Sequence, residues 1–217
     1  MDEFLSEKEQ IEQIREWWRE NGWFIVAGVA LGVVAIVGIN QYRAYKADRA
    51  EEAAALYLDL QQELEENDRE AADALLTELR EEYPSSPYTD QAGLLVASAY
   101  VAREPGRAAE ELRRVMESTD DRELSLIARL RLARVLMYQE SHEEALELLN
   151  VTDVGAFAAQ YAEARGDAHY ALGDADAART AYAEALTAPG AEWLNRNFVE
   201  MKLGALEPPA DDAESGA

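Results

Sequence analysis

Acidic residues dominate this chain of 217 residues: Asp and Glu number 44 against 20 for Lys and Arg, a formal net charge of −24. So negative a surface disfavours binding to nucleic acid and to anionic lipid. The chain has no cysteine, which excludes disulfides and cysteine-ligated metals. Composition therefore argues against a nucleic-acid binder and against a zinc module of the cysteine type.

The first predicted element is a transmembrane helix over residues 22–42. From Gly22 to Ile39 every residue is apolar or glycine. At ~1.5 Å per residue this run would form a helix about 27 Å long, close to the ~30 Å hydrocarbon core of a bilayer. Aromatic residues flank the run, as is typical of membrane interfaces: Trp17, Trp18, Trp23, Tyr42 and Tyr45. The alternative is a buried core helix, which rarely needs so long an uncharged run.

Residues 1–21 form a predicted amphipathic segment that differs from a signal peptide. A signal peptide has a short basic start and a small-residue cleavage site. Here seven acidic residues precede the apolar run, and no A-x-A pattern follows it. We therefore expect a retained anchor. Three Lys or Arg residues lie near each end of the span, so the positive-inside rule leaves the orientation undecided.

Gly28 and Gly32 form a G-x-x-x-G motif inside the predicted span. This spacing lets a second helix approach closely, which makes the two glycines a predicted helix-pairing site in the membrane. The alternative is that the motif reflects only the frequency of glycine in such spans.

Residues 43–206 are predicted to form a tetratricopeptide-like α-solenoid of about four helical hairpins. Ala, Leu and Glu dominate, apolar residues recur at helical spacing, and loop residues break the pattern about once per helix length. The clearest unit is "GDADAARTAYAEALTAPG" (173–190), which resembles the second helix of the repeat. Its matching residues are Ala178, Tyr182, Ala185 and Pro189, with Gly166 matching the preceding helix. Small residues at these positions let the two helices of a hairpin touch.

The repeat recurs along the chain at nearly constant spacing. Ala72, Ala108 and Ala145 occupy the same position as Ala178, so the four alanines are 36, 37 and 33 residues apart, against the ~34 residues of the repeat. The alternative is an irregular helical bundle. The predicted fold class is therefore all-α, with a single N-terminal transmembrane helix followed by the solenoid.

A C-terminal capping helix and an acidic tail complete the prediction. Residues 192–206 read as an amphipathic helix with Leu194, Phe198, Met201 and Leu206 on or near one face, as expected for the cap of a repeat stack. Residues 207–217 offer no apolar surface to bury, and we expect a disordered acidic tail.

The motifs of enzymes are missing from the sequence. The two histidines, His142 and His169, are not at metal-ligand spacing, and no nucleophile–base pair or phosphate-binding loop is recognisable. The sequence thus predicts no catalytic residue, no metal, no cofactor and no enzymatic activity.

A protein-binding surface is the remaining candidate for function. The first helices of such repeats line a concave groove, and aromatic, Met and Arg side chains are frequent hot spots at protein interfaces. The alternative is that these residues belong to the core. The residues predicted to point into the groove are Tyr57, Tyr100, Arg134, Met137, Tyr138 and Tyr170.

Several ordered motifs resemble the YfgM family. The stretch "EQIEQIREWWRENGWFIVAGVALGVVAIVG" (9–38) is similar to the opening of that family. The stretches "LRLARVL" (130–136), "EARGDAHYALGDADAARTAYAEAL" (163–186) and "MKLGAL" (201–206) follow in the same order. The likeness covers nearly the whole chain except the acidic tail.

The resemblance implies a function that the residues alone do not give. It implies a single-pass protein of the bacterial inner membrane, with a cytoplasmic N-terminus and a periplasmic repeat domain. It implies an ancillary subunit of the SecYEG translocon that associates with a membrane-anchored parvulin-type prolyl isomerase. Such a subunit would help to pass unfolded exported proteins to periplasmic chaperones. The alternative function is a cell-envelope scaffold in division or wall synthesis.

Overall fold

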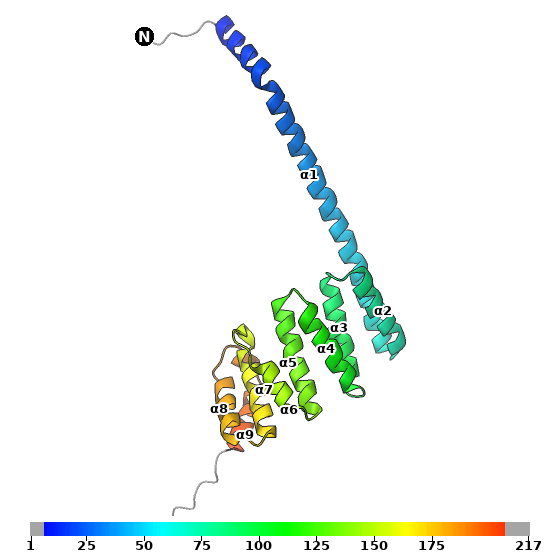
Figure 1. Ribbon diagram of the computed structural model, residues 1–217, viewed down its shortest axis with the longest axis vertical. Coiled ribbons are helices and arrows are strands. Elements are labelled where there is room, and N and C mark those ends of the chain that lie inside the picture. Colours follow the sequence, from blue (N-terminus) through cyan, green and yellow to red (C-terminus); the bar gives the residue numbers. More distant parts are fainter. Residues whose placement is uncertain (1–6, 207–217) are drawn as a thin grey trace, which may run out of the picture. The chain divides into compact units, whose positions relative to one another are not determined.

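The computed structural model describes residues 7–206, and all its regular elements in that range are helices. They are α1 (Glu7–Glu65), α2 (Arg69–Glu82), α3 (Pro87–Tyr100), α4 (Pro105–Ser118), α5 (Arg122–Tyr138), α6 (His142–Leu149), α7 (Ala158–Ala171), α8 (Ala175–Ala185) and α9 (Arg196–Gly204) (Figure 1). Two short 3₁₀ helices, η1 (Gly155–Phe157) and η2 (Ala191–Trp193), precede α7 and α9. The all-α prediction is confirmed. The predicted tail, residues 207–217, lies outside the described residues.

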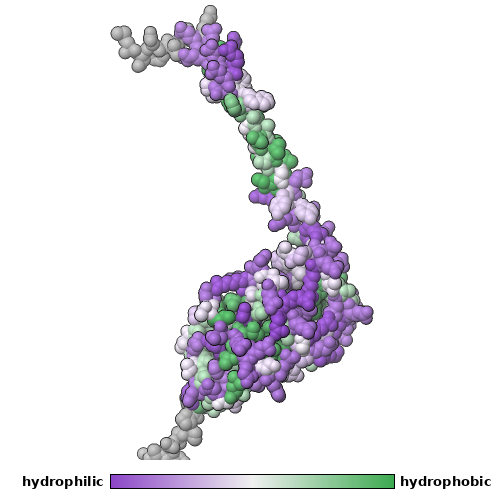
Figure 2. Space-filling view, in the orientation of Figure 1, coloured by the Kyte–Doolittle hydropathy of each residue, from purple (hydrophilic) through white to green (hydrophobic). Residues whose placement is uncertain are grey.

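The chain divides into two compact units between Glu52 and Ala53. The first unit is helical throughout its described part and contains the apolar stretch of α1, which Figure 2 shows as a green band. This stretch is long and apolar enough to cross a membrane, and its large side chains are exposed, including Val29 (62%) and Leu31 (71%). Apolar side chains at such exposure need a non-aqueous environment or a partner.

The second unit is a row of four helical hairpins followed by one further helix. The hairpins pair the end of α1 with α2, α3 with α4, α5 with α6, and α7 with α8, and each packs against the next (Figure 1). The four key alanines, Ala72, Ala108, Ala145 and Ala178, lie one in each second helix and are all fully buried. The predicted spacing therefore identified the points of closest packing.

Short polar residues start most of these helices. Asp68, Asp121 and Asp174 each accept a hydrogen bond of 3.0 Å from the backbone N–H three residues later, at the starts of α2, α5 and α8. Such N-caps satisfy one of the free backbone donors of a helix. Proline at the first position helps to start α3 and α4.

The final helix is shorter than predicted, and a different face of it is buried. It begins after Asn195, whose side chain accepts a hydrogen bond of 3.2 Å from the Phe198 N–H. This start sets a register in which Val199 is fully buried and Leu203 packs beside it. The prediction that Phe198 and Met201 share the packing face is corrected, because their side chains are 45% and 60% exposed.

Candidate functional site

Three of the predicted groove residues lie on exposed parts of two neighbouring first helices. Arg134 and Tyr138 are one helical turn apart on α5, and Tyr170 lies near the end of α7. Tyr138 is 68% and Tyr170 61% exposed. An ion pair of 3.7 Å between Arg134 and Glu163 of α7 joins the two helices on this side.

Lys202 extends this surface to α9. Its Nζ lies 3.1 Å from Oε1 of Glu163 and 2.7 and 2.9 Å from the two carboxylate oxygens of Asp167. Asp167 also accepts a hydrogen bond of 2.7 Å from the hydroxyl of Tyr182. A chain of alternating charges thus runs from Arg134 through Glu163 and Lys202 to Asp167, and its four formal charges cancel. The network fixes α5, α7 and α9 to one another.

Two exposed apolar side chains on α9 were not among the predicted site residues. Phe198 is one turn before Lys202, whose Nζ lies 4.6 Å from the centre of its ring, and Met201 is adjacent. We call Tyr138, Tyr170, Phe198 and Met201 the aromatic patch. The sequence contained a signal for the extension to α9, since Lys202 is the only lysine in residues 53–206 and stands at i+4 from Phe198.

The other predicted groove residues lie elsewhere. Tyr100 is 2% exposed, and its hydroxyl donates a hydrogen bond of 2.8 Å to Asp73 of α2 while Arg107 covers its ring at 4.1 Å. The structure thus places Tyr100 in the core, because a tyrosine with a buried acceptor fills an interhelical gap well. Tyr57 is half-buried against Tyr88, and Met137 is half-buried against the central apolar cluster.

Burial and hydrogen bonding hold the Tyr182 hydroxyl in its neutral form. Burial, the acceptor Asp167 and the charge of Glu163 all raise the pKa of Tyr182 above its ordinary value. The hydroxyl therefore remains a donor to Asp167 across the physiological pH range, which keeps the network below the aromatic patch intact.

Neither glycine of the G-x-x-x-G motif is covered in the structure. A Cβ added at Gly28 or Gly32 would meet no atom within 4 Å. The two positions therefore leave the backbone of α1 uncovered by side chains, which would let a second helix pack closely against it.

The described residues contain no arrangement of side chains that would bind a metal ion. Residues 7–206 hold no group of three or more His, Asp or Glu side chains arranged to bind a metal ion. His169 lines a cavity of 460 Å³ with residues of α6 and α7, and His142 lies at the first turn of α6. Neither histidine belongs to a metal-binding group within the described residues.

Together these features define a class of protein: an all-α helical-repeat protein with one exposed apolar helix and an aromatic surface on its repeat unit. The family model described as "Tetratricopeptide repeat-like domain" matches residues 15–208. The chain belongs to this family, and the predicted resemblance to its YfgM members is confirmed.

Curated relatives match the chain along nearly its whole length. A protein of Escherichia coli K12 is 28% identical over 207 residues, which cover 95% of this chain and 99% of the relative. A protein of Haemophilus influenzae is 28% identical, covering 93% and 98%, and one of Neisseria gonorrhoeae is 25% identical, covering 94% and 98%. Each of the three relatives is named ancillary SecYEG translocon subunit.

Proposed function

We propose that this protein is a membrane-anchored protein-interaction module that serves as an ancillary subunit of the SecYEG translocon. The relatives that carry this name align with this chain over nearly the full length of both proteins, including the residues of the apolar stretch and of the repeat unit. The observation that carries the proposal is that one chain contains both an exposed apolar stretch, in α1, and an exposed aromatic patch, on the repeat unit.

The arrangement that we propose has four parts. Residues 1–21 lie in the cytoplasm, residues 22–42 cross the inner membrane, residues 43–206 form the periplasmic repeat domain, and residues 207–217 are an acidic tail. In this arrangement the anchor raises the effective concentration of the repeat domain around polypeptides that leave the translocon.

The aromatic patch is the proposed contact surface for other polypeptides. Exposed aromatic and methionine side chains offer large contact area at low entropic cost. The charges beneath them pair with one another, so an incoming apolar segment meets no unpaired charge there. The proposed partners are unfolded exported proteins on their way to periplasmic chaperones and a membrane-anchored parvulin-type prolyl isomerase.

Site-specific cross-linking in intact cells tests this function. A photoreactive phenylalanine analogue at Tyr138 or Tyr170 should cross-link to translocon subunits, to the isomerase or to exported chains. The same analogue at Glu117, which is exposed on α4 outside the patch, is the control. Equal cross-linking at Glu117, or none of these partners at Tyr138 and Tyr170, would refute the proposed surface. Midcell accumulation of the tagged protein without translocon recovery would instead support a division scaffold.

We propose Gly28 and Gly32 as the contact face for a neighbouring transmembrane helix. Replacing both glycines by leucine adds large side chains at these open positions and prevents a second helix from approaching closely. The double variant should remain in the membrane fraction but lose co-purification with its partners from mild detergent. Undiminished recovery of partners would show that the anchor contributes only location.

A further inference from the structure

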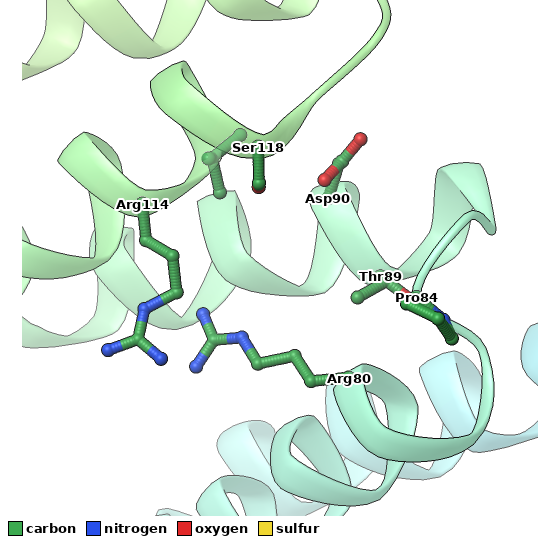
Figure 3. Close-up of a pocket in the computed structure, with 7 residues that line it drawn as sticks. Arg80, Pro84, Thr89, Asp90, Arg114 and Ser118 are labelled. Atoms are coloured by element: carbon green, nitrogen blue, oxygen red, sulfur yellow. The ribbon is translucent and has the colours of Figure 1, made fainter.

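A second site, separate from the aromatic patch, lies at one end of the second hairpin. A cavity of 190 Å³ opens where the C-terminal ends of α2 and α4 meet the N-terminal end of α3 (Figure 3). None of its lining residues belongs to the aromatic patch or to the charge network beneath it. The cavity is therefore not explained by the proposed function.

Two arginines from different helices point toward each other in this cavity. Figure 3 shows the side chains of Arg80, from α2, and Arg114, from α4, converging on one end of the space. Arg80 is paired with Glu111, with 3.4 Å between Nη1 and Oε1 and a closer contact between Nη2 and Oε2. Glu111 is 7% exposed, and its carboxylate pairs with Arg80 through both oxygens.

Arg114 has no ion pair or hydrogen bond to any residue in the part of the chain that the structure describes. This is unexpected, because Glu110 and Glu117 lie at i−4 and i+3 on the same helix, where pairing is easy. The side chain turns instead toward a second guanidinium (Figure 3). With one carboxylate for two arginines, this end of the cavity carries one uncompensated positive charge.

The shape of the cavity depends on Gly93. A Cβ at this position would lie 2.6 Å from Cγ2 of Val115 and 3.7 Å from Nη2 of Arg80. The missing side chain lets α3 and α4 approach closely at Val115, and a Cβ there would only touch the Arg80 guanidinium at ordinary contact distance. Val115 and Pro84 are the apolar lining residues of the cavity, and Pro84 lies next to Thr89, away from the two guanidinium groups (Figure 3).

We propose that this cavity binds one carboxylate group of a partner polypeptide, held by Arg114 and by the outer edge of Arg80. The planar guanidinium fork matches a carboxylate or a phosphate in two parallel hydrogen bonds. A carboxylate brings one negative charge and balances the site. A phosphate brings about −1.5 to −2, which exceeds the single positive charge of Arg114. Asp90, away from the two guanidinium groups in Figure 3, repels both anions and so does not discriminate between them.

Arginine side-chain NMR of the full-length protein in detergent micelles tests the proposal. Three probes are titrated: N-acetylglycine for a terminal carboxylate, N-acetyl-aspartic acid α-amide for a side-chain carboxylate, and inorganic phosphate. At least one carboxylate should shift the Nε–Hε signals of Arg80 and Arg114 with saturation, and the tighter of the two identifies the source of the group. N-acetylglycinamide, which has no charge, should leave both signals in place.

Substitutions separate binding at this site from general charge effects. Arg114→Gln should raise the dissociation constant of the carboxylate, measured from the Nε–Hε signal of Arg80, by about tenfold or more. It should leave the midpoint of thermal unfolding unchanged. Arg103→Gln removes an exposed arginine outside the cavity and should leave the affinity unchanged. No saturable shift with either carboxylate, equal affinity in Arg114→Gln, or tighter binding of phosphate would each overturn the proposal. None of these results depends on the aromatic patch.

Discussion

Gly166 shows how one missing side chain sets the spacing of a hairpin. A Cβ at this position would lie 2.4 Å from Cε1 of Tyr182 on the facing helix. The ring has no free space to move into, because Tyr182 is 2% exposed and its hydroxyl is bonded to Asp167. The glycine of α7 and the tyrosine of α8 are therefore complementary.

We predict that Gly166→Ala destabilises the protein. Adding a methyl group to a core that cannot rearrange lowers the free energy of unfolding by about 1–3 kcal/mol. Alanine is a better helix former than glycine by up to about 1 kcal/mol, which offsets part of this loss. The midpoint of thermal unfolding in detergent should fall. Gly106→Ala is the control, because a Cβ there meets only Gln139 at 3.8 Å. A variant at 166 as stable as the one at 106 would show that the hairpin can open without cost.

Tyr161 makes the stability of the fold sensitive to alkaline pH. Its side chain is fully buried and its hydroxyl donates a hydrogen bond of 2.8 Å to the Leu126 carbonyl. Burial raises the pKa of Tyr161 to about 12, although the charge of Arg129 acts in the opposite direction. Between pH 10 and about 12 the folded state keeps a proton that the unfolded chain releases, so stability falls as pH rises through this window.

We predict a loss of about 2–3 kcal/mol of unfolding free energy from this residue between pH 10 and 12. Tyr161→Phe should reduce the slope of the unfolding midpoint against pH in this window. Tyr138→Phe, at a position 68% exposed, should leave the wild-type slope. Identical slopes in all three proteins would contradict the link between burial and proton retention.

At the scale of elements, α9 is attached more by polar contacts than by apolar burial. Val199 is its only fully buried residue. Leu203 is half-buried beside it, and polar contacts add to this attachment: Lys202 bonds Glu163 and Asp167, and Arg179 donates a hydrogen bond of 2.7 Å to the Leu206 carbonyl just beyond the helix. Such an element opens when its charge contacts are lost.

We predict that Lys202→Met loosens α9. The change leaves Asp167 without its cation and leaves Glu163, whose side chain is 15% exposed, with only the 3.7 Å ion pair to Arg134, at a cost of about 1–3 kcal/mol. Amide hydrogen exchange in residues 196–204 should become faster while α3 and α4 stay protected. Glu200→Gln, which breaks only the exposed i,i+4 pair with Arg196 and keeps the hydrogen bond of Arg196 to the Leu186 carbonyl, should leave the exchange of α9 nearly unchanged.

Most elements could be predicted from the sequence, whereas half of the candidate site could not. The hairpins could be predicted from the alanine spacing and the loop residues, because both signals lie within one repeat of about 34 residues. Tyr100 and Tyr138 lie near the ends of equivalent helices and both read as groove residues, yet one is buried and the other exposed. Exposure depends on the neighbours that packing supplies, such as Asp73 and Arg107 around Tyr100, and spacing does not reveal them.

At the scale of the whole molecule, the repeat unit and the described part of the first unit differ in how far their apolar side chains are buried. The repeat unit buries them in three clusters along the hairpins, whereas the described part of the first unit leaves its apolar stretch exposed. A folded water-soluble unit joined to an unburied apolar helix is the arrangement of a tethered domain.

We predict that residues 1–21 and residues 43–206 lie on opposite sides of the membrane. The chain has no cysteine, so single cysteines can report on location without background. A membrane-impermeant maleimide added to intact spheroplasts should label Glu117→Cys in the repeat unit and leave Gln10→Cys unlabelled until the cells are lysed. Labelling of both positions, or of Gln10→Cys alone, would contradict the proposed topology.

The sequence by itself determined the all-α class, the positions of the hairpins and the apolar helix, because helical periodicity, small-residue spacing and run length act over short stretches of chain. Only the tertiary structure decided which side chains remain free. Tyr100 is buried, and Phe198 and Met201 are exposed. Arg80 and Arg114, which are 34 positions apart in the sequence, point toward each other from two different helices. Exposure and charge balance depend on contacts between elements, and those contacts are fixed only when the hairpins pack.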